Sequence, residues 1–387
     1  SRTLHAAITV TRGNMDNGRP ARIASLDVFR GLTIVAMILV NNPGSWGHVY
    51  GPLRHAEWHG WTLADLVFPF FLFIVGVSVA ISLGRRLASG AQRRPLYIKI
   101  IRRAIILFAL GLLLNGFPYY DLSILRIPGV LQRIAVCYLA ASVILLNTKW
   151  KGQLAWATGL LLLYWAAMEW LPVPGGGAGL YEKGNNLAAW IDGRLLTGHM
   201  WTVTKTWDPE GILSTIPAVS TTLFGALAGQ WLTGERTPRD KAAGLLAAGG
   251  AAAGIGSLWH LLLPINKSLW TSSYSVFMAG LALICLGGIY WLVDVRCWKR
   301  WTKPAVVLGM NAIAAYVLAG LAARLLYLIK VTGPDGSTMT LKTWIYKNLF
   351  ASWLGDLNGS LAFAITFIAV IWLCMLPLYC KRIFIKI

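Results

Sequence analysis

The chain has 387 residues, of which 56% are hydrophobic and 13% are charged, a composition too apolar for a soluble globular protein of this length. A formal net charge of +20 would suit a nucleic-acid-binding protein, but the Lys and Arg residues alternate with apolar segments and form no single basic patch. We therefore expect an integral membrane protein that is embedded in a lipid bilayer and does not bind nucleic acid.

Apolar runs of about 20 residues, the length that crosses the hydrocarbon core, recur along the chain. They predict an all-α, polytopic fold with ten transmembrane helices. The predicted helices cover residues 30–41, 63–83, 98–114, 127–146, 154–171, 212–232, 242–263, 269–292, 305–328 and 361–378. The first has a short apolar run and must borrow from residues 23–29.

The positive residues fix an expected orientation for these helices. More than twice as many Lys and Arg residues fall on the N-terminal segment, the even-numbered connections and the C-terminal end as on the other connections. The positive-inside rule then places both termini in the cytoplasm. We expect residues 1–20 to be a disordered cytoplasmic segment without a cleavable signal peptide, and residues 21–387 to form a single transmembrane domain.

Histidines gather on the predicted outward side, where the connections 42–62, 172–210 and 330–360 are also the longest. Five of the six lie there: His48, His55, His59, His199 and His260. This distribution favours an outward proton-transfer site, although a surface or capping role explains any single one better. Three of them share a loop with Glu57, but their spacing matches no helical zinc motif, so we expect no metal.

Ionisable residues near predicted helices mark further candidates, because a charge at membrane depth needs a partner or a water-filled cavity. Asp27 and Arg30 lie three residues apart, so they share a helix face and form either an inner-boundary ion pair or part of a site. Asp65 begins the second helix close to His59. A structural cap is the favoured explanation, with a role at the outward mouth as the alternative.

Polar residues at three other helix ends are also candidates. Gln132 and Arg133 follow a helix start, and the guanidinium suits an anionic group such as a phosphate, with a salt bridge to Asp27 or Asp65 as the alternative. Another set contains Asp208 and Glu210, which can hold a sugar or an amine or simply cap their helix. Asn266 and Lys267 lie in a short connection between two helices, and Asn311 lies inside another helix. These three matter only if they converge on one cavity.

Seven motifs spread in order along the chain carry a resemblance to a known family. They are SLDVFRG at 25–31, VN at 40–41, RHAEWHGWTLADLVFPFF at 54–71, RIPGVLQRIAVCY at 126–138, DPEGILSTIP at 208–217, PINKSLWTSSY at 264–274 and GMNAIAAY at 309–316. Together they resemble the heparan-α-glucosaminide N-acetyltransferase family of transmembrane acyltransferases, with its bacterial glucosamine N-acetyltransferase relatives.

The resemblance implies acetyl transfer from cytoplasmic acetyl-CoA, the donor substrate, to the amino group of a glucosamine-type sugar across the membrane. His55 matches the family's catalytic histidine, and Asn41 matches an asparagine that acts beside it. Asn42 is the alternative, because the loop between Asn41 and His55 looks longer than in the lysosomal enzymes. Their long lumenal N-terminal domain is missing here, which implies a minimal form in a bacterial inner membrane.

Under this reading the pantetheine arm of the donor crosses the helices in a pore. The expected cofactor-binding residues are Arg30, Gln132 and Arg133, with Arg102 and Arg103 as further candidates, and the expected acceptor-binding residues are Asp65, Asp208, Glu210, Asn266 and Lys267. His55 either deprotonates the sugar ammonium, while Asn41 donates a hydrogen bond to the oxyanion, or is itself acetylated first. We favour direct transfer.

Two other functions stay open at this point. One is a transporter of amino sugars or acylated glycans, which the lack of a clear internal repeat and the outward histidines disfavour. The other is an enzyme of the same architecture with a different acceptor, such as a cell-wall sugar. A homodimer is compatible with the sequence, but no interface can be read from it.

Overall fold

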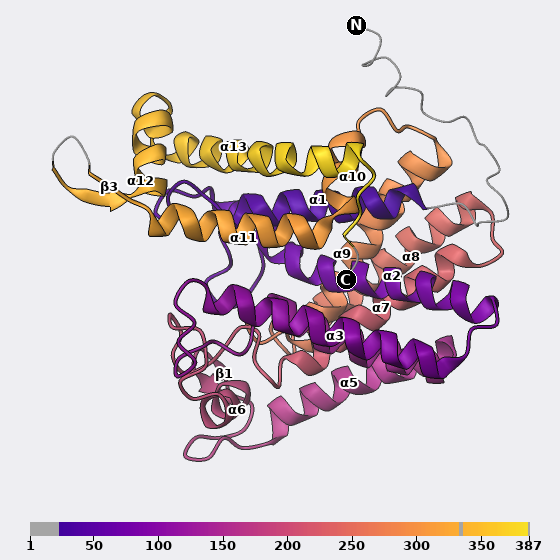
Figure 1. The fold of residues 1–387 in the computed structure, drawn as a ribbon. Coiled ribbons are helices and arrows are strands. Elements are labelled where there is room, and N and C mark those ends of the chain that lie inside the picture. Colours follow the sequence, from indigo (N-terminus) through magenta and orange to yellow (C-terminus); the bar gives the residue numbers. More distant parts are fainter. Residues whose placement is uncertain (1–22, 333–335, 386–387) are drawn as a thin grey trace, which may run out of the picture.

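The structure, a computed structural model, describes residues 23–332 and 336–385. The segment 1–20, predicted to be disordered, lies outside these residues. The described chain is mostly helical, as predicted, and its strands form two short antiparallel hairpins. Figure 1 shows the long helices side by side, with both hairpins and the short helices α6 and α12 gathered at one end of the array.

Each predicted helical segment is occupied by helix. The long helices are α1 (Ala24–Asn41), α2 (Val67–Ala88), α3 (Arg93–Gly116), α4 (Val130–Asn147), α5 (Trp150–Trp170), α7 (Thr215–Thr233), α8 (Pro238–Trp259), α9 (Ser272–Tyr290), α11 (Ala312–Leu328) and α13 (Ser352–Cys380). The shorter elements are α6 (Leu187–Leu195), α10 (Lys303–Met310), α12 (Leu341–Tyr346), β1 (Tyr181–Glu182), β2 (Asn185–Asn186), β3 (Lys330–Thr332) and β4 (Thr338–Thr340).

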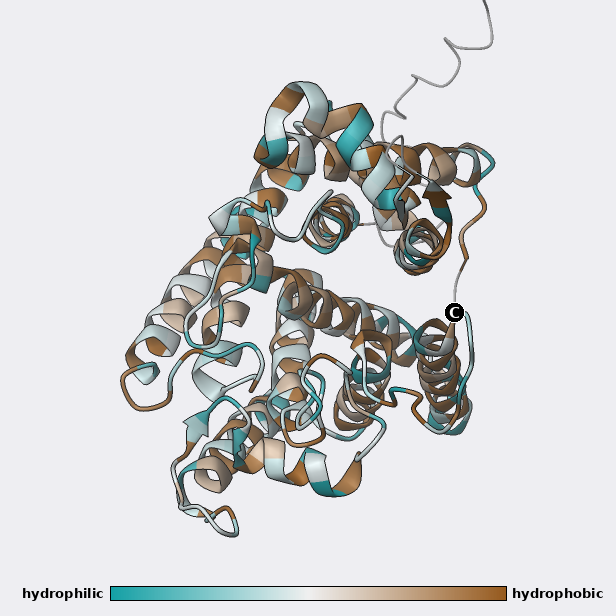
Figure 2. Ribbon diagram, turned by 90° about the vertical axis from the view of Figure 1, so that its left-hand side faces the viewer, coloured by the Kyte–Doolittle hydropathy of each residue, from teal (hydrophilic) through white to brown (hydrophobic). Residues whose placement is uncertain are grey.

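Not every helix has the length and apolarity of a membrane span. Within the described ranges six do, and the bent pair α10–α11 makes a seventh candidate. The prediction of a multi-pass helical membrane protein agrees with this, whereas ten spans and cytoplasmic termini stay predictions. Figure 2 looks onto the end that carries the hairpins and shows apolar residues dominating the helices, with polar residues concentrated in the connections.

The structure explains one predicted helix boundary and corrects another. The first helix begins at Ala24 because the Asp294 carboxylate accepts hydrogen bonds from the backbone N–H groups of Ala24 (3.3 Å) and Ser25 (3.0 Å) at its start. The predicted helix 305–328 is broken by 85° at Asn311. The buried Asn311 amide donates to the carbonyl of Ile383 (3.0 Å) and accepts from the N–H of Ile385 (2.9 Å), so it holds the C-terminal tail against the break.

Glycines let α2 and α7 approach closely. A Cβ atom on Gly76 of α2 would lie 1.8 Å from the carbonyl oxygen of Thr222, and one on Gly225 of α7 would lie 2.0 Å from that of Phe73. Such contacts between backbones are typical of helices that pack within a membrane. The close contact holds one face of α2 against α7, and residues of α2 also line the cavity described next.

Candidate functional site

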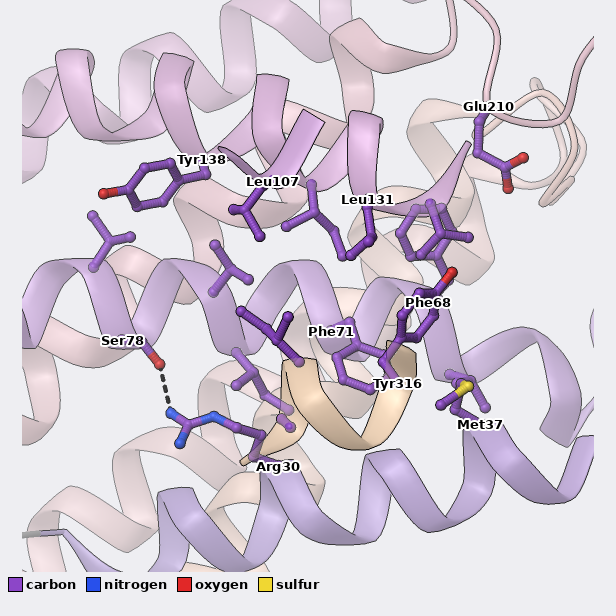
Figure 3. A pocket seen from close by; sticks show the side chains of 18 of the residues that line it. Arg30, Met37, Phe68, Phe71, Ser78, Leu107, Leu131, Tyr138, Glu210 and Tyr316 are labelled. Atoms are coloured by element: carbon purple, nitrogen blue, oxygen red, sulfur yellow. Dashed lines mark hydrogen bonds between the residues drawn. The ribbon is translucent and has the colours of Figure 1, made fainter. Parts of the chain in front are cut away.

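A single long cavity of about 2540 Å³ runs among α1, α2, α3, α4 and the α10–α11 pair. In Figure 3 the side chains of Arg30, Ser78 and Tyr138 lie toward one end and that of Glu210 toward the other. The middle is apolar, and the side chains that line it include Phe68, Phe71, Leu107 and Leu131. The cavity therefore joins two polar ends through an apolar passage.

One end of the cavity, here called the basic end, is lined by six cationic side chains: Arg30, Arg85, Arg86, Lys99, Arg102 and Arg103. Arg30 donates to Asp27 Oδ1 (3.1 Å), which is the predicted pair, and also to Ser78 Oγ (2.8 Å). The guanidinium of Arg103 lies 4.9 Å from the ring centre of Tyr138. Cations at this density form a site for a polyanion.

The other end, here called the histidine end, contains His55, Asp65, Lys267, Arg126 and Glu210. His55 Nδ1 lies 2.8 Å from Asp65 Oδ1. A carboxylate acceptor favours the proton on Nδ1, so Nε2 keeps a lone pair and can act as a base. Asp65 is 1% exposed, so its carboxylate is held almost entirely by protein groups.

Local sequence explains why Asp65 is so firmly placed. Thr62 and Asp65 form a capping box at the start of the short helix Leu63–Leu66, in which Asp65 Oδ2 accepts from the Thr62 N–H (3.0 Å). The same oxygen accepts from the N–H of Ala56 (3.1 Å), next to His55. The predicted cap is therefore present, and the capping residue is also the partner of the histidine.

Lys267 approaches this pair from the connection between α8 and α9. Its Nζ lies 3.0 Å from His55 Nδ1, 3.3 Å from His55 Nε2 and 3.4 Å from Asp65 Oδ1. Burial lowers the pKa of Lys267, and the nearby carboxylates of Asp65 and Glu210 oppose this effect. Asn266 does not line the cavity, but its Oδ1 accepts from the Leu269 N–H (2.9 Å) and so shapes the turn.

Asn41 and Asn42 are separated by the structure. Asn41, the last residue of α1, lines the cavity. Asn42 is buried, and its Nδ2 donates back to the carbonyl of Ile38 (2.9 Å). Of the two alternatives for the asparagine that acts beside His55, only Asn41 faces the cavity.

A second ion-pair cluster closes the histidine end. Arg126 donates through Nε and Nη2 to the two oxygens of Asp208 (2.8 and 2.7 Å), and Nη2 also donates to Glu210. Burial would lower the pKa of Arg126, but the two carboxylates raise it overall. Asp208 does not line the cavity, whereas Arg126 and Glu210 do. Arg126 therefore contacts both carboxylates and offsets one of their two negative charges. The sequence had offered it only as the first residue of the motif 126–138.

Gln132 and Arg133 do not lie where a cofactor-binding role requires. Both are buried and neither lines the cavity, because α4 turns Leu131, Ile134 and Tyr138 toward it. Arg133 instead donates to the Gly211 carbonyl (3.1 Å) and lies 5.1 Å from the ring centre of Trp270. This placement also differs from the predicted salt bridge to Asp27 or Asp65.

The other outward histidines have separate contacts. His48 faces Asp356 (3.7 Å), away from the cavity. His59 lies 3.4 Å from Asn266, and burial lowers its pKa, while His199 Nδ1 contacts the carbonyl of Leu125 (2.9 Å). Within the part of the chain that the structure describes, no group of three or more His, Cys, Asp and Glu side chains could hold a metal ion.

Comparisons with known proteins give the chain its family. The model of the family described as heparan-alpha-glucosaminide N-acetyltransferase, catalytic, matches residues 22–263. Among curated proteins, the heparan-alpha-glucosaminide N-acetyltransferases of Homo sapiens and Mus musculus are both 32% identical, over 355 and 357 residues. These alignments cover 77% and 76% of this chain but 52% and 53% of the relatives, so the chain spans about half their length. The chain therefore belongs to the heparan-α-glucosaminide N-acetyltransferase catalytic family.

Proposed function

We propose that this protein is a transmembrane N-acetyltransferase that moves an acetyl group from cytoplasmic acetyl-CoA to the amino group of a glucosamine-type sugar on the periplasmic side. The observation that carries the proposal is one cavity that connects six cationic side chains to the His55–Asp65 pair. Membership of the family supports the type of reaction. The proposed setting is a bacterial inner membrane, crossed by ten helices with both termini in the cytoplasm.

The donor fits the cavity in one direction. The phosphates of acetyl-CoA match the basic end, where Arg30 and Arg103 line the wall, and the extended pantetheine arm matches the apolar passage. The thioester then lies at the histidine end. The reverse arrangement would put a polyanion beside Asp65 and Glu210, which is electrostatically unfavourable.

The chemistry at the histidine end is a base-assisted acyl transfer. His55 Nε2 takes a proton from the ammonium of the sugar, and the neutral amine attacks the thioester carbonyl. Asn41 donates a hydrogen bond to the developing oxyanion, and the Asp65 carboxylate stabilises the imidazolium. The C–S bond breaks, His55 returns its proton to the departing thiolate, and the second proton that the nitrogen loses passes to water. Direct transfer remains our preference over an acetylated His55, because the second route needs a further covalent step.

Residues 183–210, here called the lid, contribute Lys183, Trp201 and Trp207 to the cavity wall, and the acceptor would enter past them. Trp58 and Trp207, whose ring centres lie 5.2 Å apart, line this entrance together with Glu210. Aromatic faces and a carboxylate suit a sugar that carries an ammonium group. Because Glu210 is shared with Arg126, its contribution to holding a cation is smaller than the sequence alone suggested.

A direct assay tests this function. The purified protein in detergent is incubated with labelled acetyl-CoA and glucosamine, and labelled N-acetylglucosamine is the expected product. The competing reading, a sugar transporter, predicts no product and requires no acetyl-CoA. Uptake of glucosamine into vesicles that contain the protein but no acetyl-CoA would favour that reading.

A further inference from the structure

Lys267 places a primary amine where the proposed reaction uses one. Its Nζ lies 3.3 Å from Nε2 of His55, the nitrogen that would deprotonate the ammonium of the sugar. The side chain lines the same cavity that would hold the thioester. The chain thus carries, beside its own candidate base, the functional group that the acceptor is expected to bring.

We infer that Lys267 is an acetylation site of the protein itself, which receives the acetyl group of an acyl-CoA thioester when no sugar occupies the histidine end. This inference rests on the proposed function, since it uses the same donor and the same base. It adds a covalent state of the site that the sugar would normally prevent.

The step balances without any further reactant. His55 Nε2 takes one proton from the Lys267 ammonium, and neutral Nζ attacks the carbonyl carbon of the thioester. A C–N bond forms and the C–S bond breaks. The departing thiolate receives the proton held by His55, and the second proton lost by the nitrogen passes to water.

Acetylation of Lys267 would stop the enzyme from turning over further substrate. An amide does not return its acetyl group to a sugar amine under these conditions, so acetylated Lys267 is a side product and lies outside the route to N-acetylglucosamine. Acetylation also removes the positive charge that lies 3.4 Å from Asp65 Oδ1. The added group would fill the space next to His55, so we expect a modified molecule to be inactive toward sugars.

Other lysines at the cavity lack this arrangement and provide controls. Lys183 and Lys99 also line the cavity, but Lys99 belongs to the basic end and Lys183 to the lid. Both are exposed, so any reaction with acetyl-CoA there would be uncatalysed. Lys183 is the matched control because it lies toward the same end as Lys267.

The experiment incubates the full chain in detergent with acetyl-CoA and no sugar, digests it, and measures acetyl occupancy at each lysine by tandem mass spectrometry. We expect acetylation of Lys267 in the wild type, about 100-fold slower acetylation in His55→Asn, and the wild-type rate in His48→Asn. Lys183 should react equally in all three proteins. Lys267→Arg should show no acetylation at position 267, which verifies the peptide assignment.

The pH dependence gives a second readout. Only a neutral amine attacks, so both lysines react faster as pH rises. Because burial lowers the pKa of Lys267, its rate should level off at a lower pH than that of an ordinary lysine side chain. Thermal unfolding of each variant verifies that the fold is intact.

Added glucosamine separates the two hypotheses. If both hold, N-acetylglucosamine forms and Lys267 acetylation falls. Acetylated glucosamine together with a Lys267 that stays unmodified in the reaction without sugar, or Lys267 acetylation that His55→Asn does not slow, would overturn the inference and leave the proposed function standing. If neither glucosamine nor Lys267 is acetylated, the proposed function fails and the inference fails with it.

Discussion

The two ends of the cavity differ in how their charges are balanced. Among the described residues that line it, the basic end has six cationic side chains and one carboxylate, Asp27. The histidine end has Lys183, Lys267 and Arg126 beside Glu57, Asp65 and Glu210, and several of these contact one another. An excess of one sign suits binding of a charged ligand, whereas a balanced set suits proton transfer with little change in net charge.

The largest expected effect is at His55. Replacing His55 by Ala removes the proposed base, so kcat for acetyl transfer should fall by about 1000-fold. His48→Ala is the matched control, because His48 lies in the same loop but pairs with Asp356 outside the cavity. Rates measured with radiolabelled acetyl-CoA check this. Equal activity of the two variants would remove His55 from the mechanism.

Asp65→Asn tests whether Asp65 acts by orienting His55, as distinct from the acid–base chemistry of His55 itself. The asparagine keeps the size of the side chain but removes the negative charge that favours the proton on His55 Nδ1. We expect kcat to fall by about 100-fold with KM for acetyl-CoA nearly unchanged. Steady-state kinetics test this, with thermal unfolding to monitor the capping box. A rise in KM alone would instead indicate that Asp65 binds substrate.

At the basic end the expected effect is on binding. Arg103→Gln removes one cation from the cavity wall. A hydrogen bond to a charged group contributes about 1.5–3 kcal/mol to binding. KM for acetyl-CoA should therefore rise about tenfold or more, with little change in kcat. Arg94→Gln on the same helix is the control, since Arg94 does not line the cavity. The difference should shrink as salt is added. A lower kcat with unchanged KM would contradict the division between the two ends.

The smallest expected effect concerns Asp192, which lies behind the histidine end and accepts from the N–H groups of Asp208 (3.2 Å) and Ile212 (2.9 Å). Burial raises its pKa to about 6. The folded protein therefore holds a proton that the unfolded chain releases at a lower pH, and stability falls as pH rises from about 4 to about 6.

Asp192→Asn removes this titration. The Tm of the variant relative to the wild type should increase by about 2 °C or more between pH 4.5 and pH 7. Thermal unfolding in detergent at the two pH values measures the change. A Tm difference that is the same at both pH values would show that Asp192 does not keep its proton.

The sequence predicted some of these features because their signals are local. Apolar runs located the helical segments, and the motif around His55 identified the residue that the structure places beside Asp65 and Lys267. The start of α1 agrees with the expected extension into residues 23–29, but its cap, Asp294, was missed because it is far away in the sequence. The break at Asn311 was missed for a similar reason, since it depends on contacts with residues 383–385.

The sequence also did not predict the direction in which helical side chains point. Arg133 was predicted to bind an anion because of its depth in a helix, and Arg126 was not singled out. The depth is as expected, but the helix turns Arg133 away from the cavity, while Arg126, in the loop before α4, reaches it. The facing of a helix depends on all its neighbours, and those tertiary contacts cannot be read from one sequence.

The most direct test of the account uses sealed vesicles in which the purified protein is reconstituted in one orientation. Acetyl-CoA is supplied only on the side of the basic end and glucosamine only on the other side. The account predicts N-acetylglucosamine in the glucosamine compartment, with the product lost in His55→Ala. Product that forms only when both substrates are on the same side would contradict transfer through the cavity.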